Sequence, residues 1–348
     1  MGRATRAAVW TAALAGGAAA GYLAERSVLR PRLALPAPAG PPLGSIAGEV
    51  REVRGPDGMR ITVESYGPEG APQIVLSHAW TCTGRVWHEQ VLALSDRFRL
   101  ITYDQPGHGR TSQPRSRRYD LDLFGDSLAA VIDQATAPGP LVLAGHSLGG
   151  MTVLNWMRRC APGERERVRG IVLMSTTSRA AADDVALGFG IHTVARLERI
   201  ITRGLALVRP ETTYLAQRLY RASSDLSFLL TRTFGLAPDA DPRYVDFTEQ
   251  LVLDSDLDMI TAVMAPVLTL DEDEALTCVT VPMKVVVGTA DKVTPLGLSR
   301  RMCDRCPSAE LVALPGVGHM APLEAHGTVN ALLHAMASGV LTQHEEIA

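Results

Sequence analysis

Three side chains that lie far apart in the sequence could together perform nucleophilic catalysis. A serine hydroxyl is a poor nucleophile until a base takes its proton, and the base needs an acid that orients it and balances its charge. Ser147 lies between two close glycines, and Asp291 and His319 each follow a short apolar run that predicts a strand. Because loops at the carboxyl ends of parallel strands meet at one edge of a sheet, we predict Ser147 as the nucleophile, Asp291 as the acid and His319 as the base.

The residues around Ser147 fit a strand, a tight turn and a helix in succession. The apolar run Leu141–Leu143 precedes the serine, and a helical stretch over Met151–Cys160 follows it. This is the context in which the pattern G-x-S-x-G forms a nucleophile elbow, with the serine, the acid and the histidine in this order along the chain. The backbone of such a serine is strained, and we expect Gly145 and Gly149 to be required because larger side chains would crowd the turn.

Acyl transfer also needs hydrogen-bond donors for the charge that develops on the carbonyl oxygen, an oxyanion hole. The residue after the nucleophile, Leu148, is expected to supply one backbone amide. The second is expected from a loop after an early strand, and residues 77–81 follow the predicted strand Ile74–Leu76. We predict the backbone amide of Trp80 as this donor, with His78 bracing the loop and the Trp80 side chain either at the site or in the core.

Other acids and histidines compete for these roles. Asp183 and Asp184 follow a predicted strand over Ile171–Met174 and are the alternative acids. The segment Asp104–Arg110 has two glycines, but it lacks the final Lys-Ser/Thr pair and the third glycine of the nucleotide-binding motifs. We therefore predict a tight turn. The remaining histidines are predicted to be structural or exposed; they include His108, His146, His192 and His334.

Short apolar runs separated by helical patterns predict an α/β fold. The strands are expected to form a mostly parallel, twisted sheet with helices on both faces. An alternating segment over Ile61–Tyr66, with Glu49–Val53 as a hairpin partner, precedes the buried runs. One helix has Leu121, Phe124, Leu128 and Val131 on a single stripe. The predicted buried strands are Gln73–His78, Leu100–Tyr103, Leu141–Ala144, Ile171–Met174, Lys284–Val287 and Leu311–Leu314, and a helical stretch over Pro322–Ala337 follows the last of them.

The alternation of strands and helices stops between Ser175 and about Leu276. A helical apolar stripe from Ile191 to Val208 stands out in this region, and Pro238–Pro242 predicts a turn between further helical stretches. We therefore predict a core built from residues 45–176 and 277–342, with residues 177–276 inserted as a helical cap.

The N-terminal segment lies outside this pattern. Residues 7–24 are uncharged, are rich in Ala and Gly, and have arginines on both sides. Within residues 1–30 this run fits a membrane anchor, a cleaved secretory signal or a soluble helix. Residues 31–44 are rich in Pro, Ala and Gly and predict a linker. Membrane association through residues 7–24 is our expectation, with a secreted or a cytoplasmic protein as the alternatives.

Composition excludes several classes of function. The chain has 34 Lys and Arg against 37 Asp and Glu, a net charge of -3, and no basic block, so we expect no nucleic-acid partner. The five cysteines are an odd number in a chain too large to need disulfides, and the Cys303-x-x-Cys306 pair has no second pair to complete a zinc site. We expect no metal and no cofactor, with the cysteines at the surface or in helix packing.

Taken together, the motifs make the chain resemble the α/β-hydrolase superfamily, in its cap-bearing branch of esterases and lipases. The resemblance covers roughly residues 45–340. Ala79 departs from the pattern, because relatives usually have glycine after the histidine of the oxyanion loop. The four motifs are, in order, His78-Ala-Trp80, Asp104-x-x-Gly-His-Gly109, Gly145-His-Ser-Leu-Gly149, and Asp291 with His319.

The resemblance implies a cofactor-independent serine hydrolase that acts on small, lipophilic carboxylic esters. A serine at the elbow argues against the epoxide hydrolases and haloalkane dehalogenases of this fold, which use an aspartate. Thioester, lactone, amide or carbon–carbon bond hydrolysis and perhydrolysis at the same triad remain open, as does a non-catalytic ligand-binding protein.

Overall fold

The computed structural model describes residues 40–180 and 231–345. The predicted N-terminal segment, the apolar stripe from Ile191 to Val208, and the alternative acids Asp183 and Asp184 lie outside the described residues. Within these two ranges, no helix is both long and apolar enough to cross a membrane.

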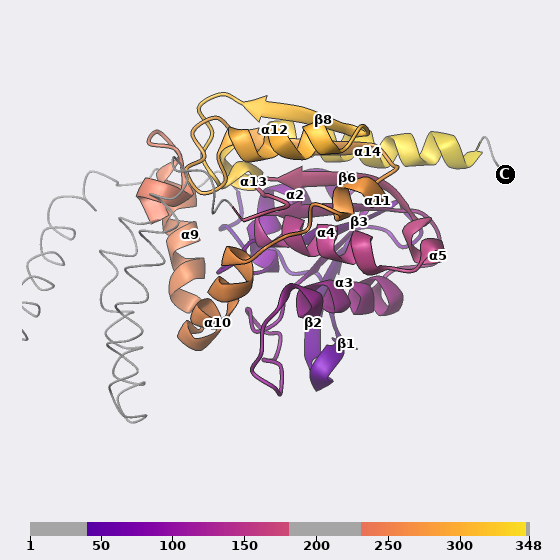
Figure 1. Cartoon of the computed structure of the whole chain (residues 1–348), viewed down its shortest axis with the longest axis horizontal. Helices are drawn as coiled ribbons and strands as arrows, with labels where there is room; N and C mark the ends of the chain where they lie inside the picture. Colours follow the sequence, from indigo (N-terminus) through magenta and orange to yellow (C-terminus); the bar gives the residue numbers. More distant parts are fainter. Residues whose placement is uncertain (1–39, 181–230, 346–348) are drawn as a thin grey trace, which may run out of the picture.

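A single eight-stranded sheet forms the centre of the molecule (Figure 1). Its strand order is β1-β2-β4-β3-β5-β6-β7-β8. β2 runs antiparallel to both β1 and β4, and all other neighbours are parallel, so the predicted mostly parallel sheet and its N-terminal hairpin are confirmed. The strands are β1 Glu49–Arg54, β2 Arg60–Tyr66, β3 Gln73–Ser77, β4 Arg99–Tyr103, β5 Leu141–His146, β6 Val168–Met174, β7 Met283–Gly288 and β8 Ala309–Leu314.

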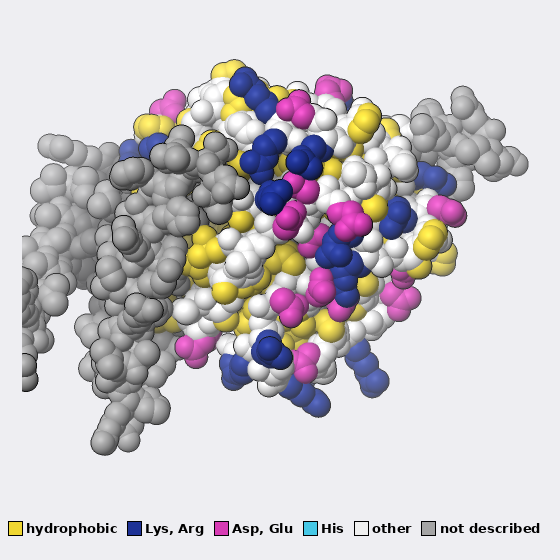
Figure 2. Space-filling view, viewed as in Figure 1, with side chains coloured by type: hydrophobic (Ala, Val, Ile, Leu, Met, Phe, Trp, Pro, Cys, Tyr) yellow, Lys and Arg dark blue, Asp and Glu magenta, His cyan; other side chains and the backbone are white. Residues whose placement is uncertain are grey.

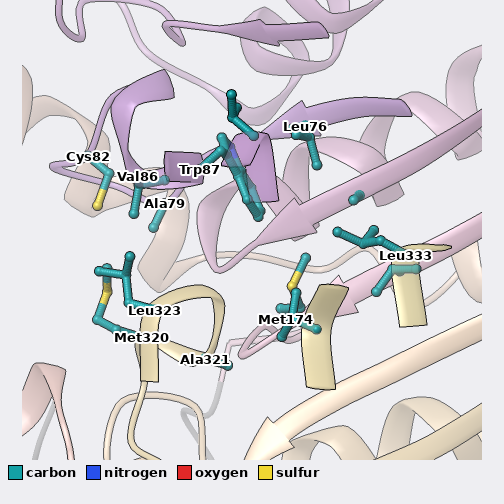
Figure 3. Packing of buried hydrophobic residues seen from close by; sticks show 14 of the residues in the cluster. Leu76, Ala79, Cys82, Val86, Trp87, Met174, Met320, Ala321, Leu323 and Leu333 are labelled. Atoms are coloured by element: carbon teal, nitrogen blue, oxygen red, sulfur yellow. The ribbon is translucent and has the colours of Figure 1, made fainter. Parts of the chain in front are cut away.

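Successive residues of the central strands point into two separate hydrophobic cores. In β5, Val142 and Ala144 belong to one core, whereas Leu141 and Leu143 belong to the other. This alternation follows from the two-residue period of a strand, and it explains why these strands are apolar throughout. Figure 3 shows part of the first core, in which Trp87 and Leu76 lie opposite Leu323 and Leu333.

Helices cover both faces of the sheet (Figure 1). Residues of α2, α13 and α14 fill the first core, and residues of α3, α4, α11 and α12 fill the second. The helices of the core are α2 His88–Leu94, α3 Leu121–Ala135, α4 Leu148–Arg159, α5 Pro162–Arg165, α11 Ala275–Cys278, α12 Leu296–Arg305, α13 Ala321–Glu324 and α14 His326–Glu345, with short 3-10 turns at η3 Pro56–Gly58 and η4 Gly84–Trp87.

Local signals explain where several of these helices begin and end. Asp120 caps α3 by accepting a hydrogen bond from the amide of Leu123 at 2.8 Å, and the predicted apolar stripe of this helix is buried. The predicted stretch Pro322–Ala337 is in fact two helices, because the chain leaves helical geometry at Ala325 between α13 and α14.

The described part of the predicted insertion is helical. It comprises the π-helical turn η6 Thr231–Gly235, α9 Pro242–Asp254 and α10 Leu257–Leu268. Asp241 and Asp256 cap the two α-helices. Beyond α10, Ala275 and Leu276 of α11 already pack in the second core, so the chain returns to the core slightly before the predicted boundary at residue 277.

Charges of both signs are interspersed over the face of the molecule shown in Figure 2. Many of them are paired, as in the contacts of Arg158 with Glu272 and of Arg159 with Asp126. The five cysteines are free. In the described part of the chain, no group of three or more His, Cys, Asp or Glu side chains could hold a metal ion.

Candidate active site

Ser147 occupies a strained turn between β5 and α4. It has φ 52° and ψ -116°, a conformation that residues with a side chain rarely adopt. Its amide donates to the carbonyl of Met174 at 2.9 Å, which ties the turn to the end of β6. A strained serine at the start of a helix is the geometry predicted for the elbow.

The glycines on either side of Ser147 are required by close backbone contacts. A Cβ on Gly145 would lie 2.4 Å from the carbonyl oxygen of Gly149, and a Cβ on Gly149 would lie 2.0 Å from the carbonyl oxygen of Ser77. Neither φ is positive, so the requirement is for space. The same contact holds the start of α4 against the loop that follows β3.

That loop contains Trp80, whose backbone amide was predicted as an oxyanion donor. The amide of Cys82 donates to the carbonyl of Ala79 at 3.1 Å and closes a four-residue turn, in which Thr81 has φ 59°. The positive φ therefore falls on Thr81, and the alanine at position 79 sits in ordinary backbone geometry. No hydrogen bond within the described residues uses the amide of Trp80 or of Leu148.

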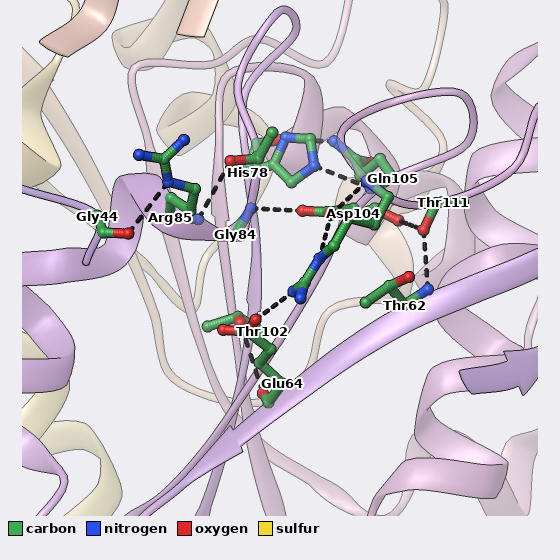
Figure 4. Close-up of polar contacts among 12 residues, drawn as sticks. Gly44, Thr62, Glu64, His78, Gly84, Arg85, Thr102, Asp104, Gln105 and Thr111 are labelled. Atoms are coloured by element: carbon green, nitrogen blue, oxygen red, sulfur yellow. Dashed lines mark hydrogen bonds and ion pairs between the residues drawn. The ribbon is translucent and has the colours of Figure 1, made fainter. Parts of the chain in front are cut away.

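A buried polar network fixes this loop from behind (Figure 4). His78 accepts a hydrogen bond from the amide of Gln105 at 2.8 Å and pairs with the carbonyl of Ala79 at 2.7 Å. Gln105 also bonds the carbonyl of His78 and the hydroxyl of Thr152 in α4. Burial lowers the pKa of His78 to about 4, so its ring is neutral and can accept as well as donate.

The segment after β4 forms the tight turn that the sequence predicts. The Asp104 carboxylate accepts hydrogen bonds from the amides of Gly84 and Arg110 at 2.8 Å and 2.9 Å. A Cβ on Gly109 would lie 2.3 Å from that carboxylate. His108 in the same turn accepts a hydrogen bond from the amide of Thr81 at 3.3 Å. This turn therefore supports the Trp80 loop.

Asp291 and His319 are brought together at the ends of β7 and β8. His319 Nδ1 lies 2.9 Å from Asp291 Oδ2, and both side chains are buried. The carboxylate also accepts hydrogen bonds from the amides of Val293 and Thr294 and from the Thr294 hydroxyl, at 2.8 to 2.9 Å. Burial alone would raise the pKa of Asp291, but the His319 charge and these hydrogen bonds outweigh it and lower that pKa below its usual value.

His146 connects His319 to the elbow. His146 Nε2 donates to the backbone carbonyl of His319 at 2.8 Å, and the two rings lie 5.2 Å apart between centroids. Because His146 immediately precedes Ser147, this bond holds the His319 loop against the elbow. The side chains of Ser147 and His319 are not hydrogen-bonded to each other in this structure; such bonds are often long before a substrate binds.

An apolar wall lies beside the elbow. Leu148 and Met151 of α4 pack with Tyr119, Phe124 and residues of α10, and Trp80 packs against the same cluster. Tyr119 also lines a surface pocket of about 290 Å³, whose other lining residues are Gln113, Arg117, Asp258 and Ala262. The wall therefore joins the predicted oxyanion residues to helix α10 of the insertion.

Two of the residues around Ser147, Asp291 and His319 were not anticipated from the sequence. Thr294 supports the carboxylate of Asp291, and its spacing three residues after an aspartate is a signal for such a local bond. Gln105 lies in the predicted turn, but nothing in its local sequence points to its bonds with His78 and Thr152.

Comparison with known families gives one match that covers most of the chain. A model of the alpha/beta hydrolase family matches residues 74–332. This range includes the elbow, both loops behind it, the Asp291 and His319 loops, and the insertion.

Individual relatives add detail. A pimeloyl-[acyl-carrier protein] methyl ester esterase of Chromobacterium violaceum is 26% identical over 77% of this chain and 94% of its own length. A probable oxidoreductase EphD of Mycobacterium bovis is 34% identical over 130 residues, which are 37% of this chain but only 22% of that protein. The crystal structure of the esterase RhEst1 from Rhodococcus sp. ECU1013 superimposes with a TM-score of 0.67 and 20% identity, over 84% of this chain and 99% of that one.

Proposed function

The chain belongs to the alpha/beta hydrolase family, and from this premise we propose that it is a serine hydrolase that cleaves carboxylic esters through an acyl-enzyme intermediate. The observation that carries the proposal is the buried bond of 2.9 Å between His319 Nδ1 and Asp291 Oδ2, on a loop that His146 holds against the elbow. This pairing leaves the other ring nitrogen of His319 free to exchange a proton with a serine hydroxyl.

In the first half of the proposed reaction, Ser147 Oγ attacks the acyl carbon of the ester while His319 Nε2 takes the hydroxyl proton. The carbonyl electron pair moves onto oxygen, and the amides of Trp80 and Leu148 stabilise the negative charge. When the electron pair returns, the bond to the alcohol breaks and His319 gives its proton to the leaving oxygen. Asp291 orients the imidazole and balances its charge throughout.

In the second half, a water molecule takes the place of the alcohol. His319 removes a proton from the water as its oxygen attacks the acyl carbon of the intermediate, and the same two amides hold the oxyanion. Collapse of this species breaks the bond to Ser147 Oγ, which recovers the proton. The products are a carboxylic acid, an alcohol and the free enzyme, with no cofactor required.

The proposed substrate is a small ester with a lipophilic acyl or alcohol group. The wall of apolar side chains next to Leu148 and Trp80 supports this choice, because an apolar group bound there would remove hydrocarbon surface from water. The similarity to a methyl ester esterase over most of both chains also supports ester cleavage.

The experiment that tests the proposal combines a serine-directed probe with graded substrates. We expect a fluorophosphonate to label Ser147 in the folded protein, and the enzyme to hydrolyse p-nitrophenyl esters. Ser147→Ala should abolish labelling and lower turnover by about 10⁴-fold or more, because the residual rate then comes from binding and the oxyanion donors alone. Folded protein that neither takes up the probe nor cleaves any ester would disprove the proposal.

The choice of acid is tested separately. Asp291→Ala should lower turnover by about 10²- to 10⁴-fold, since the imidazole loses both its orientation and its counter-charge. Asp183→Ala is the matched control, because Asp183 was one of the two competing acids in the sequence, with Asp184, and it should retain near wild-type activity. A panel of thioesters, lactones and amides run beside the esters would show which acyl group is preferred.

A further inference from the structure

Glu324, the last residue of α13, makes three hydrogen bonds to backbone amides. Its Oε2 accepts from the amide of Ala237 at 2.7 Å and from that of Gly318 at 3.1 Å, and its Oε1 accepts from the amide of Met320 at 3.0 Å. Gly318 and Met320 are the two neighbours of His319. One carboxylate thus holds the chain on both sides of the proposed base.

The third amide belongs to the insertion. Ala237 follows the turn η6, and the insertion backbone here touches the His319 loop directly. A Cβ on Gly318 would lie 2.4 Å from the amide nitrogen of Ala237 and 2.5 Å from the carbonyl carbon of Leu236. There is therefore no room for a side chain between the two segments, and the Glu324 carboxylate bridges them.

The neighbouring Asp291 loop is tied to the same segment. Lys292, the residue after Asp291, donates from Nζ to the carbonyl of Thr233 at 3.0 Å. Residues 233–237 thus contact the loops of both the proposed acid and the proposed base. In Figure 1, the orange segment that leads into α9 lies beside the ends of these loops.

These contacts bring a carboxylate into a partly buried position. Burial raises the pKa of Glu324, and the three amides oppose that shift by stabilising the ionised form. Keeping a charged carboxylate partly buried costs free energy that an apolar residue at this position would not cost. The cost is understandable if the carboxylate fixes a loop whose position matters for the chemistry.

We propose that Glu324 is the positioning residue for His319, and that it acts jointly with Ala237, so that the segment of the insertion between η6 and α9 forms part of the support of the base. This inference rests on the proposed function, because it assigns Glu324 a role in turnover through His319. Glu324 touches no reacting atom and takes no proton in the cycle. Its effect is on where the imidazole lies relative to Ser147.

The test uses the full chain and two substitutions at one site. Glu324→Ala removes all three bonds, and we expect kcat for p-nitrophenyl butyrate to fall about 10- to 100-fold with KM within about threefold, as for a misplaced catalytic group. Glu324→Gln keeps one acceptor oxygen and the side-chain shape, so it should restore part of the rate, to within about tenfold of wild type.

The matched control is Glu272→Ala. Glu272 is a buried glutamate, and it joins the far end of the insertion to Asn155 and Arg158 of α4, at 2.7 Å in each case. This control should lower the urea midpoint of unfolding and leave kcat within about twofold of wild type. A positioning role predicts that kcat and stability separate in this way, whereas a structural role predicts that they change together in both variants.

A second readout does not depend on substrate. The proton that His319 Nδ1 donates to Asp291 should give a low-field proton resonance, which we expect to be shifted or lost in Glu324→Ala and retained in Glu272→Ala. If both folded Glu324 variants keep the wild-type kcat and this resonance, the positioning role is wrong. If wild-type protein has no activity and takes up no fluorophosphonate, the proposed function is wrong, and the resonance alone decides the role of Glu324.

Discussion

The two halves of the candidate site are held in place by different kinds of contact. The nucleophile half, residues 77–81 and 145–150, is held by backbone atoms in direct contact, as where Gly149 meets the carbonyl of Ser77, and its loop is also held by the buried hydrogen bonds of His78 and Gln105. The acid–base half, residues 288–294 and 317–320, also has close backbone contacts, as where Gly288 meets the carbonyl of Val317. In addition, side-chain hydrogen bonds fix its acid and the loop of its base, including those to Asp291 and those from the loop amides to Glu324.

This difference determines how each half responds to change. Backbone atoms packed at van der Waals distance cannot move apart unless a strand or a helix shifts. A single added methyl group therefore lowers the stability of the whole fold. A side-chain hydrogen bond contributes about 1 kcal/mol, so losing one shifts a loop by a small, graded amount. We therefore expect substitutions at the close backbone contacts of the elbow to act through stability, and substitutions of the side chains that bond Asp291 or the His319 loop to act through rate.

Of the substitutions that test this comparison, Gly149→Ala should have the largest effect. The new Cβ would lie 2.0 Å from the carbonyl oxygen of Ser77 and 2.8 Å from that of His78, so β3 or α4 must shift. We expect a loss of about 3 kcal/mol or more in the free energy of unfolding, measured by urea titration. Gly163→Ala is the control, because a Cβ there meets nothing within 4 Å, and it should be neutral or slightly stabilising. Equal stability of the two variants would contradict a nucleophile half fixed by backbone contact.

The complementary substitution in the acid–base half is Thr294→Val. It keeps the shape of the side chain and removes the hydroxyl that donates to Asp291 Oδ2 at 2.9 Å, while the two amide donors to the carboxylate remain. We expect kcat to fall about tenfold and the free energy of unfolding to change by about 1 kcal/mol or less. Thr277→Val, which removes the hydroxyl that donates to the carbonyl of Glu274, should leave kcat unchanged. A Thr294 variant that loses stability but not rate would reverse the comparison.

The same contrast explains which parts could be predicted from the sequence. The elbow and the strands leading to it follow from local patterns, namely the apolar run, the glycine spacing and the helix that comes next. The contacts that complete the acid–base half join residues far apart along the chain. Glu324 and Ala237 are 87 residues apart, and His146 and His319 are 173 apart. No local pattern encodes such pairs, because they depend on how the insertion and the last helices pack.

Boundaries were also less predictable than elements. The predicted helix over Pro322–Ala337 gave no sign of the break at Ala325, yet this break ends α13 at Glu324 and leaves its carboxylate beside the His319 loop. The sequence also did not show how the alanine at position 79 would affect the turn, because a turn can have its positive φ at more than one position. In this loop the positive φ falls on Thr81, a β-branched residue for which that conformation is strained, and Ala79 has no positive φ.

The two halves should also differ in how much each contributes to the loss of stability at low pH, and this is the smallest of the expected effects. Burial lowers the pKa of His78 to about 4 and those of His108 and His146 to about 3, from 6.5 in an unfolded chain, and all three lie in or directly behind the nucleophile half. Between pH 6.5 and about 4 the unfolded state therefore binds more protons than the folded state, and stability falls as the pH falls. The lowered pKa of Asp291 acts only below its ordinary value of 3.8, and the pKa of Glu324, which burial raises, makes the folded chain bind that proton first. The acid–base half therefore does not add to the loss of stability in this window.

His108→Gln tests this assignment. Lowering the pH from 7.5 to 5.5 should destabilise the variant by about 1 kcal/mol less than wild type, because one buried histidine no longer resists protonation. Urea midpoints at the two pH values measure the difference. Thr294→Val is the control from the other half, and its loss over the same interval should equal that of wild type, since it removes no group that titrates between these pH values. If Thr294→Val flattened the pH dependence and His108→Gln did not, the acid-sensitive contacts would lie in the acid–base half.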